Sequence, residues 1–297
     1  MRDSPQKAWV DSRRILLSAI MVAAFAFAAW LLLRPIESTG PSQPAPVAPA
    51  RAIATEGRAT VSFAGAHAYA GLPRTVGYPN PLLTLVNRAY TVGYDETRRN
   101  PAWSAYRLPA DILPQKFPRP TRFRADTRTR AAVRSEDYTG SGFDRGHLTP
   151  NHAIATRFGA AAQEETFLMS NIIPQSPELN RGPWKDLEAT VADRAAPACR
   201  ELWVTVGPAY RGTPQRLRSD SEIPSACWML IADETPSGPR LQAILLPQAP
   251  TSSDFRAGLT TVDTVERATG LDFYTDLPDE QEERLESQTP VYWLESP

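Results

Sequence analysis

The chain has 297 residues, and its 32 basic and 33 acidic side chains leave a net charge of −1. This balance excludes a uniformly polycationic nucleic-acid binder. It does not exclude an enzyme with one basic face, because the position of charge matters more than its sum. Three histidines, two cysteines and no C-x-x-C pair argue against a structural zinc site, which needs four ligands, and exclude iron–sulfur clusters.

An apolar segment near the amino terminus predicts a membrane anchor. Residues 15–33 contain no charged side chain, and as a helix they span roughly 28 Å, close to the hydrocarbon thickness of a bilayer. Arg13 and Arg14 precede the segment, so the positive-inside rule keeps residues 1–14 in the cytoplasm and exports the rest to the periplasm or the exterior. A cleaved signal peptide is the alternative and would make the protein secreted. The length of the segment and its Trp-Leu-Leu-Leu-Arg ending favour an uncleaved signal anchor.

A proline-rich segment follows the apolar one. Five prolines between positions 35 and 49 favour extended polyproline conformations and cannot support a core. We therefore expect a linker over residues 34–59 and one folded domain over residues 60–297, a usual size for a single unit.

The folded domain should contain strands and helices in mixed order. Runs rich in β-branched and aromatic residues predict strands at 82–94, 103–108, 202–206, 228–232 and 241–246. Helical patterns predict helices at 160–167, 183–195 and 261–269. Pro183 suits the first turn of a helix, and Gly270 suits a helix end. Because strands and helices do not alternate regularly, the expected fold class is α+β.

The segment Phe143-Asp-Arg-Gly-His147 carries residues that suit phosphate chemistry. In a strand, the two-residue period puts Arg145 and His147 on one face, and Gly146 leaves the other face without a side chain. A histidine can take a proton from water near neutral pH, and an arginine offers a fork of donors to a phosphate. For this motif alone, an ordinary strand with one exposed histidine and one salt-bridged arginine is the preferred interpretation, so a functional role needs support from elsewhere.

That support comes from two asparagines and a glutamate further along the chain. Asn171 lies in a short apolar run, and Asn180 precedes the helix expected from Pro183. An amide oxygen with several waters suits Mg²⁺, although Asn180 also suits a helix N-cap. A straight helix would separate Asn180 from Glu188 by about 12 Å, too far for both to touch one ion. If the helix begins near Pro183, Asn180 lies in the preceding turn and can approach the same ion.

The ordered motifs resemble those of the DNA/RNA non-specific endonuclease family, which includes the mitochondrial endonuclease G type and secreted bacterial nucleases. The motifs are DYTGSGFDRGHLTP, TFLMSNIIPQ and LNRGPWKDLE, and the match runs from about Tyr94 to Leu285. The resemblance implies a ββα-metal (His-Me finger) nuclease domain on a central antiparallel sheet, preceded here by one transmembrane helix. The family often has a small residue after D-R-G-H, where this chain has Leu148.

The resemblance also implies a role for each residue of these motifs. His147 is the general base, and Asn180 is the protein ligand of one Mg²⁺ ion, with Mn²⁺ as the alternative metal. Glu188 holds metal-bound water, Arg145 contacts phosphate, and Asn171 supports the site by fixing His147. A further phosphate-binding arginine of the family lies upstream of these motifs, and here Arg122 and Arg124 both remain candidates.

The implied function is a membrane-tethered, Mg²⁺-dependent, sugar-non-specific endonuclease that cleaves DNA and RNA and leaves 5′-phosphates. Because a histidine activates water, a ribose 2′-OH is not needed. Two alternatives are a membrane-anchored nucleic-acid-binding or uptake protein without hydrolysis and a phosphodiesterase acting on small nucleotides. The sequence gives no protein partner and leaves a homodimer open.

Two stretches of the chain have local charges that differ strongly from the net charge of −1, one positive and one negative. Seven basic residues and one acidic residue between positions 116 and 134 give a local charge of +6, which favours a footprint on the phosphate backbone. Six acids and one arginine between positions 276 and 286 give −5, which is typical of a solvated helical face.

Four further residues have weaker signals. Cys199 and Cys227 would form a disulfide outside the cytoplasm if their strands bring them together, and the sequence does not decide this. His67 and His152 are expected to be surface or structural residues.

Overall fold

The structure is a computed structural model that describes residues 66–288 and 291–294. The expected cytoplasmic segment 1–14, membrane anchor 15–33 and linker 34–59 lie outside the described residues. Residues 59–297 group into one unit of the chain. Within the described ranges, no helix is both long and apolar enough to cross a bilayer.

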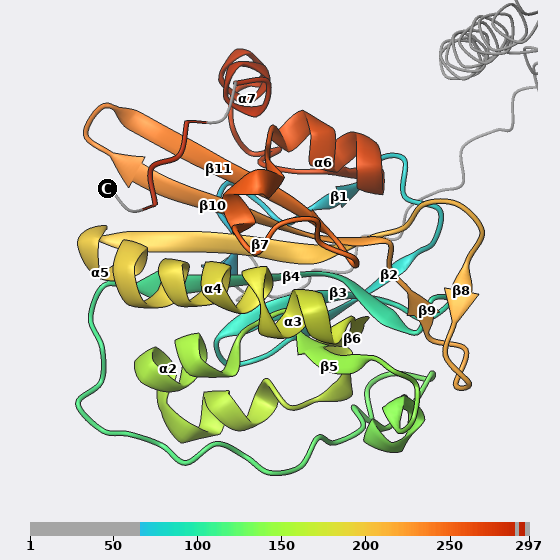
Figure 1. Cartoon of the computed structure of the whole chain (residues 1–297). Helices are drawn as coiled ribbons and strands as arrows, with labels where there is room; N and C mark the ends of the chain where they lie inside the picture. Colours follow the sequence, from blue (N-terminus) through green and yellow to red (C-terminus); the bar gives the residue numbers. More distant parts are fainter. Residues whose placement is uncertain (1–65, 289–290, 295–297) are drawn as a thin grey trace, which may run out of the picture. The chain divides into compact units, whose positions relative to one another are not determined.

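A seven-stranded sheet runs through the centre of this unit (Figure 1). Every neighbouring pair is antiparallel, and the strand order is β12-β11-β10-β7-β4-β3-β2. The strands are β2 (Leu82–Val86), β3 (Tyr90–Asp95), β4 (Asn100–Pro109), β7 (Glu201–Ala209), β10 (Ala226–Thr235), β11 (Gly238–Pro247) and β12 (Leu259–Thr260). The expected α+β class and central antiparallel sheet are confirmed.

Both faces of the central strands are buried, because successive residues pack into different cores. On β10, Cys227, Met229 and Ile231 belong to one hydrophobic cluster. Trp228 and Leu230 belong to the other cluster. A strand covered on both faces has a continuous run of apolar residues. For this reason the composition of residues 228–232 is enough to predict a strand.

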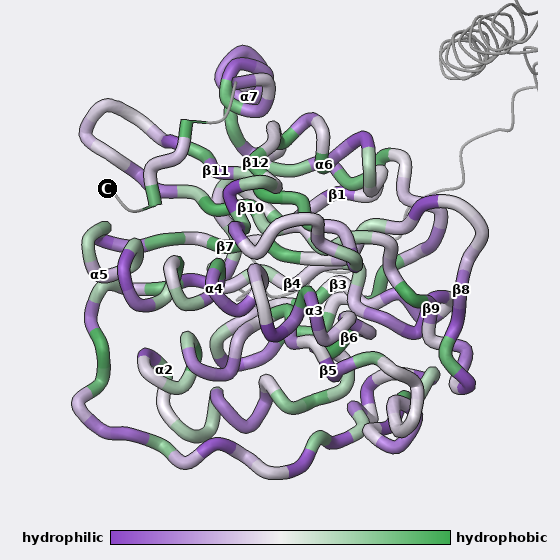
Figure 2. The backbone as a smooth tube through the Cα atoms, viewed as in Figure 1, coloured by the Kyte–Doolittle hydropathy of each residue, from purple (hydrophilic) through white to green (hydrophobic). Residues whose placement is uncertain are grey.

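Helices cover the two faces unevenly (Figure 1). One face carries α2 (Asn151–Glu165), α3 (Pro177–Arg181), α4 (Pro183–Ala189), a π-helical turn (Thr190–Ala195) and α5 (Ala196–Ala198). The other face carries α6 (Val262–Thr269) and α7 (Asp279–Glu286). In Figure 2 α7 is largely hydrophilic, whereas apolar residues are frequent along the central strands.

Three two-stranded pairs accompany the main sheet. They are β1 (Arg74–Thr75) with β13 (Leu271–Asp272), β5 (Asp144–His147) with β6 (Ile172–Gln175), and β8 (Gln215–Arg216) with β9 (Glu222–Ile223). Short 3₁₀ turns at Ser135–Tyr138, Met169–Asn171 and Phe255–Gly258 complete the described elements. The β5–β6 pair lies on the face that carries α2, α3 and α4.

Two sequence predictions need correction. The single strand expected at 82–94 is a hairpin, in which the Asn87 N–H donates to the Tyr90 carbonyl at 2.8 Å. The turn lies between two strands rich in apolar residues, so the composition of the segment did not predict it. The helix expected at 160–167 is the second half of α2, which begins at Asn151 and breaks at Gly159, where φ is 78°. A left-handed glycine interrupts the helical period, so only the half after it was recognised.

The helix ends predicted from proline and glycine are confirmed. Pro183 is the first residue of α4, and the predicted helix to 195 continues through the π-helical turn. Gly270 ends α6 in the left-handed region at φ 76°. Cys199 and Cys227 are both free thiols. Cys227 is the second residue of β10, whereas Cys199 lies near Arg240, which pairs with Asp233 close to the other end of that strand.

Candidate active site

The β5–β6 hairpin presents Arg145 and His147 on the same side, as the strand period predicts. Both residues line one pocket. Gly146 between them faces the buried Gln175, and a Cβ at this position would lie 2.1 Å from Gln175 Oε1. Any side chain here would overlap Gln175, so glycine is required for the hairpin to pack on the sheet.

A sharp turn between α3 and α4 brings Asn180 and Glu188 to the same pocket. Asn180 lies inside α3, and Gly182 occupies the N-cap position of α4, so the alternative of Asn180 as an N-cap is wrong. Gly182 separates the two helices, and a Cβ there would lie 2.5 Å from the Glu178 carbonyl. The chain therefore bends where a straight helix would have kept Asn180 and Glu188 apart.

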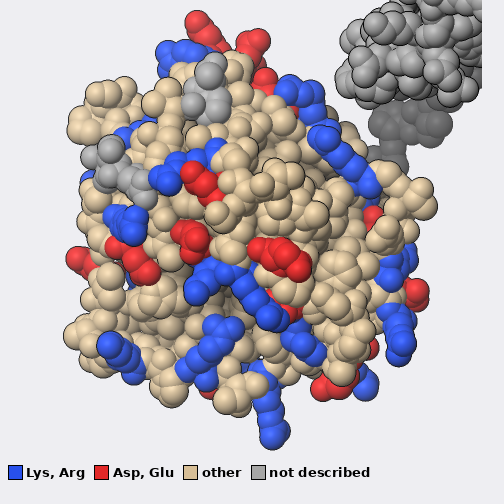
Figure 3. Space-filling view, in the orientation of Figure 1, with Lys and Arg blue, Asp and Glu red and all other residues tan. Residues whose placement is uncertain are grey.

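The pocket has a volume of about 650 Å³ and contains both acid–base and cationic groups. The polar lining residues are Arg119, Arg145, His147, Asn151, His152, Asn180, Arg181, Lys185, Glu188 and Asp193. Figure 3 shows Lys and Arg side chains gathered on the face that carries α3 and α4, with acidic side chains among them. The pocket can therefore receive an anion and still offer carboxylate and amide oxygens.

His147 is neutral in this pocket. Its ring packs against Phe123 and Phe167, with centroids 5.4 and 5.1 Å away. Burial and then the nearby Arg119 guanidinium lower the pKa of His147 to about 3. Nε2 is buried and has no hydrogen-bond partner among the described residues. An imidazole held neutral at pH 7 can accept a proton.

Burial shifts the pKa of Glu188 upward, in the opposite direction to that of His147. Burial raises the pKa of its carboxyl to about 8, against a hydrogen bond from Trp184 and the charge of Arg119, which lower it. The Trp184 indole Nε1 donates to Glu188 Oε1 at 3.1 Å, and Trp184 is buried in the core. The carboxyl is therefore held in place but lacks a counter-charge strong enough to keep it ionised.

Asn180 is oriented by Asp144. Asn180 Nδ2 donates to Asp144 Oδ2 at 2.9 Å, and Arg181 forms an ion pair with the same carboxylate at 2.6 Å. Hydrogen bonds from Arg181 and Asn180 lower the pKa of Asp144, so it stays ionised. With its nitrogen fixed in this way, Asn180 has its oxygen as the remaining acceptor.

Arg145 is held by the segment before the hairpin. Its Nε donates to Ser135 Oγ at 2.8 Å, and its Nη2 donates to the Ser135 carbonyl and, at 3.4 Å, to Thr139 Oγ1. Its guanidinium also lies 5.6 Å from the centre of the Tyr138 ring. These contacts fix the guanidinium at the pocket rim before any ligand arrives.

Asn171 lies behind the pocket and not in it. Its Oδ1 accepts the Thr149 N–H at 2.9 Å, and its Nδ2 donates to the Thr149 and Thr166 carbonyls at 3.0 Å. Asn171 is fully buried. It therefore fixes the backbone two residues after His147, and the structure shows no hydrogen bond between the two side chains.

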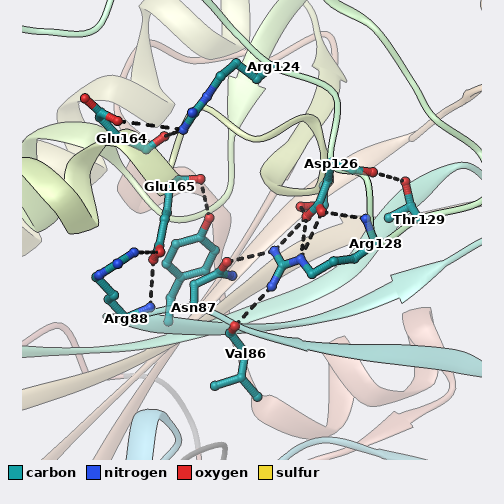
Figure 4. Close-up of polar contacts among 11 residues, drawn as sticks. Val86, Asn87, Arg88, Arg124, Asp126, Arg128, Thr129, Glu164 and Glu165 are labelled. Carbon is teal, nitrogen blue, oxygen red and sulfur yellow. Dashed lines mark hydrogen bonds and ion pairs between the residues drawn. The ribbon is translucent and has the colours of Figure 1, made fainter.

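The upstream arginine in the pocket is Arg119, which the sequence did not single out. Arg119 lines the pocket beside His147, with its guanidinium 5.0 Å from the centre of the Phe167 ring. Neither candidate from the sequence lines it. Arg122 is exposed elsewhere, and Arg124 lies 3.9 Å from Glu164 (Figure 4). In a run of seven basic residues, no spacing rule distinguishes the one that faces the site.

Ion pairs also reduce the free charge of that basic stretch. Arg128 binds Asp126 at 2.6 Å, Asn87 Oδ1 at 2.8 Å and the Val86 carbonyl at 3.1 Å (Figure 4). Burial opposes ionisation of Asp126, but hydrogen bonds from Arg128 and Ser170 lower its pKa. Part of the +6 stretch therefore fastens the loop to β2, and the phosphate footprint is narrower than the sequence indicates.

His152 lies closer to the site than expected. It lines the pocket on α2, and its Nε2 lies 2.8 Å from Asp193 Oδ1 in the π-helical turn. The sequence offered no signal for this pair, because the two residues lie 41 positions apart. His67 contacts Thr91 Oγ1 at 2.9 Å and does not line the pocket.

Comparisons with known proteins identify the family of this chain. A sequence model of the DNA/RNA non-specific endonuclease family matches residues 74–280. A nuclease of Serratia marcescens is 30% identical over 221 residues, covering 70% of this chain and 81% of that protein. A nuclease of Nostoc sp. is 30% identical over 220 residues, covering 69% and 77%. Human mitochondrial endonuclease G is 27% identical, covering 68% and 72%.

A solved structure shows the same fold. The crystal structure of the EndoG/EndoGI complex contains a chain with a TM-score of 0.60 and 24% identity, covering 70% of this chain and 92% of that one. The family model spans more than half of the chain and includes every motif of the pocket. The chain therefore belongs to the DNA/RNA non-specific endonuclease family and is an endonuclease, a phosphodiester hydrolase.

Proposed function

We propose that the protein is a membrane-tethered, Mg²⁺-dependent nuclease that cleaves both DNA and RNA, with His147 as general base and Asn180 as metal ligand. The observation that carries this proposal is the convergence of His147, Asn180, Glu188 and Arg145 in one pocket. These residues come from β5, α3 and α4, so only the folding of the whole domain places their side chains in one pocket.

The residues present fit a Mg²⁺ ion. Asn180 supplies an amide oxygen, a hard donor that Mg²⁺ prefers, and Glu188 supplies a carboxylate that would hold one of the several waters the ion keeps. Glu188 is a half-buried carboxyl whose pKa of about 8 reflects burial, and a cation would supply the missing counter-charge. Mn²⁺ takes similar ligands and is the alternative. When bound, the ion would polarise the phosphate and stabilise the departing 3′ oxygen.

His147 is suited to take the proton from the attacking water. Its Nε2 is buried, so Nδ1 is the nitrogen left to meet a water, and the ring proton then resides on Nε2. Because the ring is neutral at pH 7, it accepts the proton without first losing one. The attack uses water and no ribose hydroxyl, so DNA and RNA are both substrates.

The arginines complete the mechanism. Arg145, held by Ser135, and Arg119 offer donors to the phosphate oxygens, where negative charge grows in the transition state. Arg181 and Lys185 extend the cationic lining along α3 and α4 and suit contacts with the flanking phosphate backbone. Such contacts position a polymer without reading its sequence.

Tethering to a membrane is the second part of the proposal. It is supported by the uncharged run at residues 15–33, the arginines before it and the proline-rich linker after it. We expect the full chain to fractionate with membranes and its nuclease domain to be digested by protease added from outside the cytoplasm. A mature protein that begins near residue 35 would instead show a cleaved signal and a secreted enzyme.

The catalytic proposal is tested with the full chain, plasmid DNA and RNA. We expect cleavage of both polymers with Mg²⁺ and none with a chelator. His147→Ala should lose about 10²–10⁴-fold in rate, the usual contribution of general base catalysis. His67→Ala is the matched control, because His67 lies outside the pocket.

Three outcomes would contradict the proposal. Equal cleavage by His147→Ala would exclude the proposed base. Binding of DNA without cleavage by the unmodified chain would favour a nucleic-acid-binding protein. Hydrolysis confined to mononucleotide esters would favour a small-nucleotide phosphodiesterase.

A further inference from the structure

A cluster of acidic residues lies between α6 and α7, on the sheet face opposite α3 and α4 (Figure 1). The sequence predicts a solvated helical face for the acidic stretch around α7. The structure corrects this in part, because Leu285 and Glu286 at the end of α7 are buried. The acidic stretch therefore has an inner side as well as an exposed one.

Three carboxylates converge at this inner side. Asp263 and Glu266 are three residues apart on α6 and so share a face of that helix. Glu286 reaches them from α7, and carboxylate oxygens of all three residues lie within 4.8 Å of one another. The two helices thus contribute negative charge to one point.

Glu286 is a buried side chain without a partner at this point. It is only 6% exposed, and among the described residues no donor reaches its Oε1. Glu282, one helical turn earlier, has a buried Oε1 in the same condition. A buried carboxylate without donors is costly, so an unpaired one directed at two others indicates a missing positive charge.

Neighbouring groups do not supply that charge. Within 4 Å, Asp263 meets the guanidinium of Arg267 at 3.6 Å, but Arg267 is 68% exposed. Glu266 Oε1 accepts the Phe273 N–H at 3.0 Å, which is a neutral donor. Burial, and then the charges of Glu266 and Glu282, raise the pKa of Glu286 to about 9.

We propose that Asp263, Glu266 and Glu286 bind a calcium-class divalent cation that joins α7 to α6. Ca²⁺ takes six to eight oxygen ligands at about 2.3–2.6 Å, so oxygens on opposite sides of it lie about 5 Å apart. The three carboxylates fit within this span without a large rearrangement, because their oxygens all lie within 4.8 Å of one another. Mg²⁺ demands ligands nearer to one another and keeps more water, and Zn²⁺ prefers nitrogen and sulfur donors.

The consequence of this site is stability and not catalysis. None of the three carboxylates lines the catalytic pocket. Glu266 also receives the Phe273 N–H, and Phe273 directly follows β13, which pairs with β1. A bound ion would therefore hold α7, α6 and the β1–β13 pair together at one edge of the domain.

The experiment measures thermal unfolding of the full chain by tryptophan fluorescence, first with a chelator and then with Ca²⁺ alone. At a Ca²⁺ concentration about one hundred times Kd, we expect the Tm to rise by about 5 °C. Asp263→Asn combined with Glu286→Gln should abolish the rise. Glu280→Gln, on the exposed side of α7, should keep it.

Two further variants keep the result interpretable. Glu286→Gln alone replaces the buried carboxyl by a neutral amide of similar size and is expected to fold even if the double variant does not. It too should lose most of the Ca²⁺-induced rise. Asn180→Ala should retain the rise, which separates this site from the catalytic one. An unmodified chain with no Ca²⁺-induced rise, or a rise of equal size in Glu286→Gln, would overturn the proposal.

Discussion

Glu188 and Glu286 lie on opposite faces of the same sheet, and burial raises the pKa of both carboxyls. Their neighbours differ. Glu188 shares an open pocket with Arg119 and His147 and accepts a hydrogen bond from Trp184 behind it, whereas Glu286 faces Asp263 and Glu266. The first setting admits a cation and a phosphate together, and the second admits a cation but repels a phosphate. Surroundings, and not the carboxyl itself, would separate the proposed catalytic metal site from the proposed structural one.

The largest effect that would sharpen this contrast is expected at Asn180. Removing the amide in Asn180→Ala deletes a ligand, so the Mg²⁺ concentration for half-maximal cleavage should rise by more than the 10–100-fold typical of lost outer partners. The measurement is a Mg²⁺ titration of plasmid cleavage. Asp144→Asn is the companion variant, because it weakens the contact with Asn180 Nδ2 but keeps the ligand, and it should show a smaller rise. An unchanged Mg²⁺ requirement in Asn180→Ala would exclude Asn180 as a ligand.

The second expected effect is a pH dependence that follows Mg²⁺. Without a cation, Glu188 is protonated below pH 8, and Mg²⁺ requires the ionised carboxyl, so affinity should fall by up to about tenfold per pH unit as pH decreases. His147 stays neutral far below this range, because its pKa is lowered to about 3. The acid limb of cleavage should therefore move to lower pH as Mg²⁺ increases, and Glu188→Gln should flatten it.

The pH experiment distinguishes the base from the metal site. If the acid limb stays at one pH over a 100-fold range of Mg²⁺, it reports protonation of a group other than the carboxyl at the cation site. His147 with a pKa near its ordinary value would then be the simplest explanation, and its low pKa in the unliganded pocket would not persist in the working enzyme.

A third, smaller effect compares Arg119 with Arg124. Arg119→Ala removes a pocket cation, and we expect about a tenfold loss in rate and a decrease of about one in the slope of binding against salt. Arg124→Ala breaks a contact with Glu164 outside the pocket, so it should change cleavage little. Both are measured as cleavage and DNA binding over a range of salt. Equal losses in the two variants would indicate that the whole basic stretch contacts DNA.

Local rules predicted the residues whose position depends on a short stretch of chain. Arg145 and His147 follow from the strand period, Pro183 marks the start of α4, and Gly270 marks the end of α6. The expectation that Asn180 and Glu188 converge depended on a helix starting at Pro183, and the turn at Gly182 provides it.

Contacts between distant segments were not predictable in this way. Arg119 lines the pocket with its guanidinium 5.0 Å from the ring of the distant Phe167, and His152 meets Asp193 across 41 positions. The acidic stretch of α7 reads as a solvated face because nothing in its own sequence reports the two carboxylates on α6. A run of charged residues shows how much charge a segment carries. Which of those side chains face one another depends on how the segment packs in the fold.

The smallest expected effect concerns the acidic face in the absence of any divalent cation. There the pKa of Glu286 is raised to about 9, so folding near neutral pH must protonate a carboxyl that is ionised in the unfolded chain. Glu286→Gln removes that cost, so the free energy of unfolding should increase by about 1 kcal/mol. Glu280→Gln, which is exposed, should stay within about 0.5 kcal/mol of the unmodified chain. Urea unfolding in a chelator measures both. With saturating Ca²⁺, Glu286→Gln should instead be less stable than the unmodified chain and Glu280→Gln, because the ion stabilises only the chains that keep Glu286. A Glu286→Gln variant that is less stable in the chelator would mean that the carboxyl already has a partner, and the contrast between the two faces would then fail.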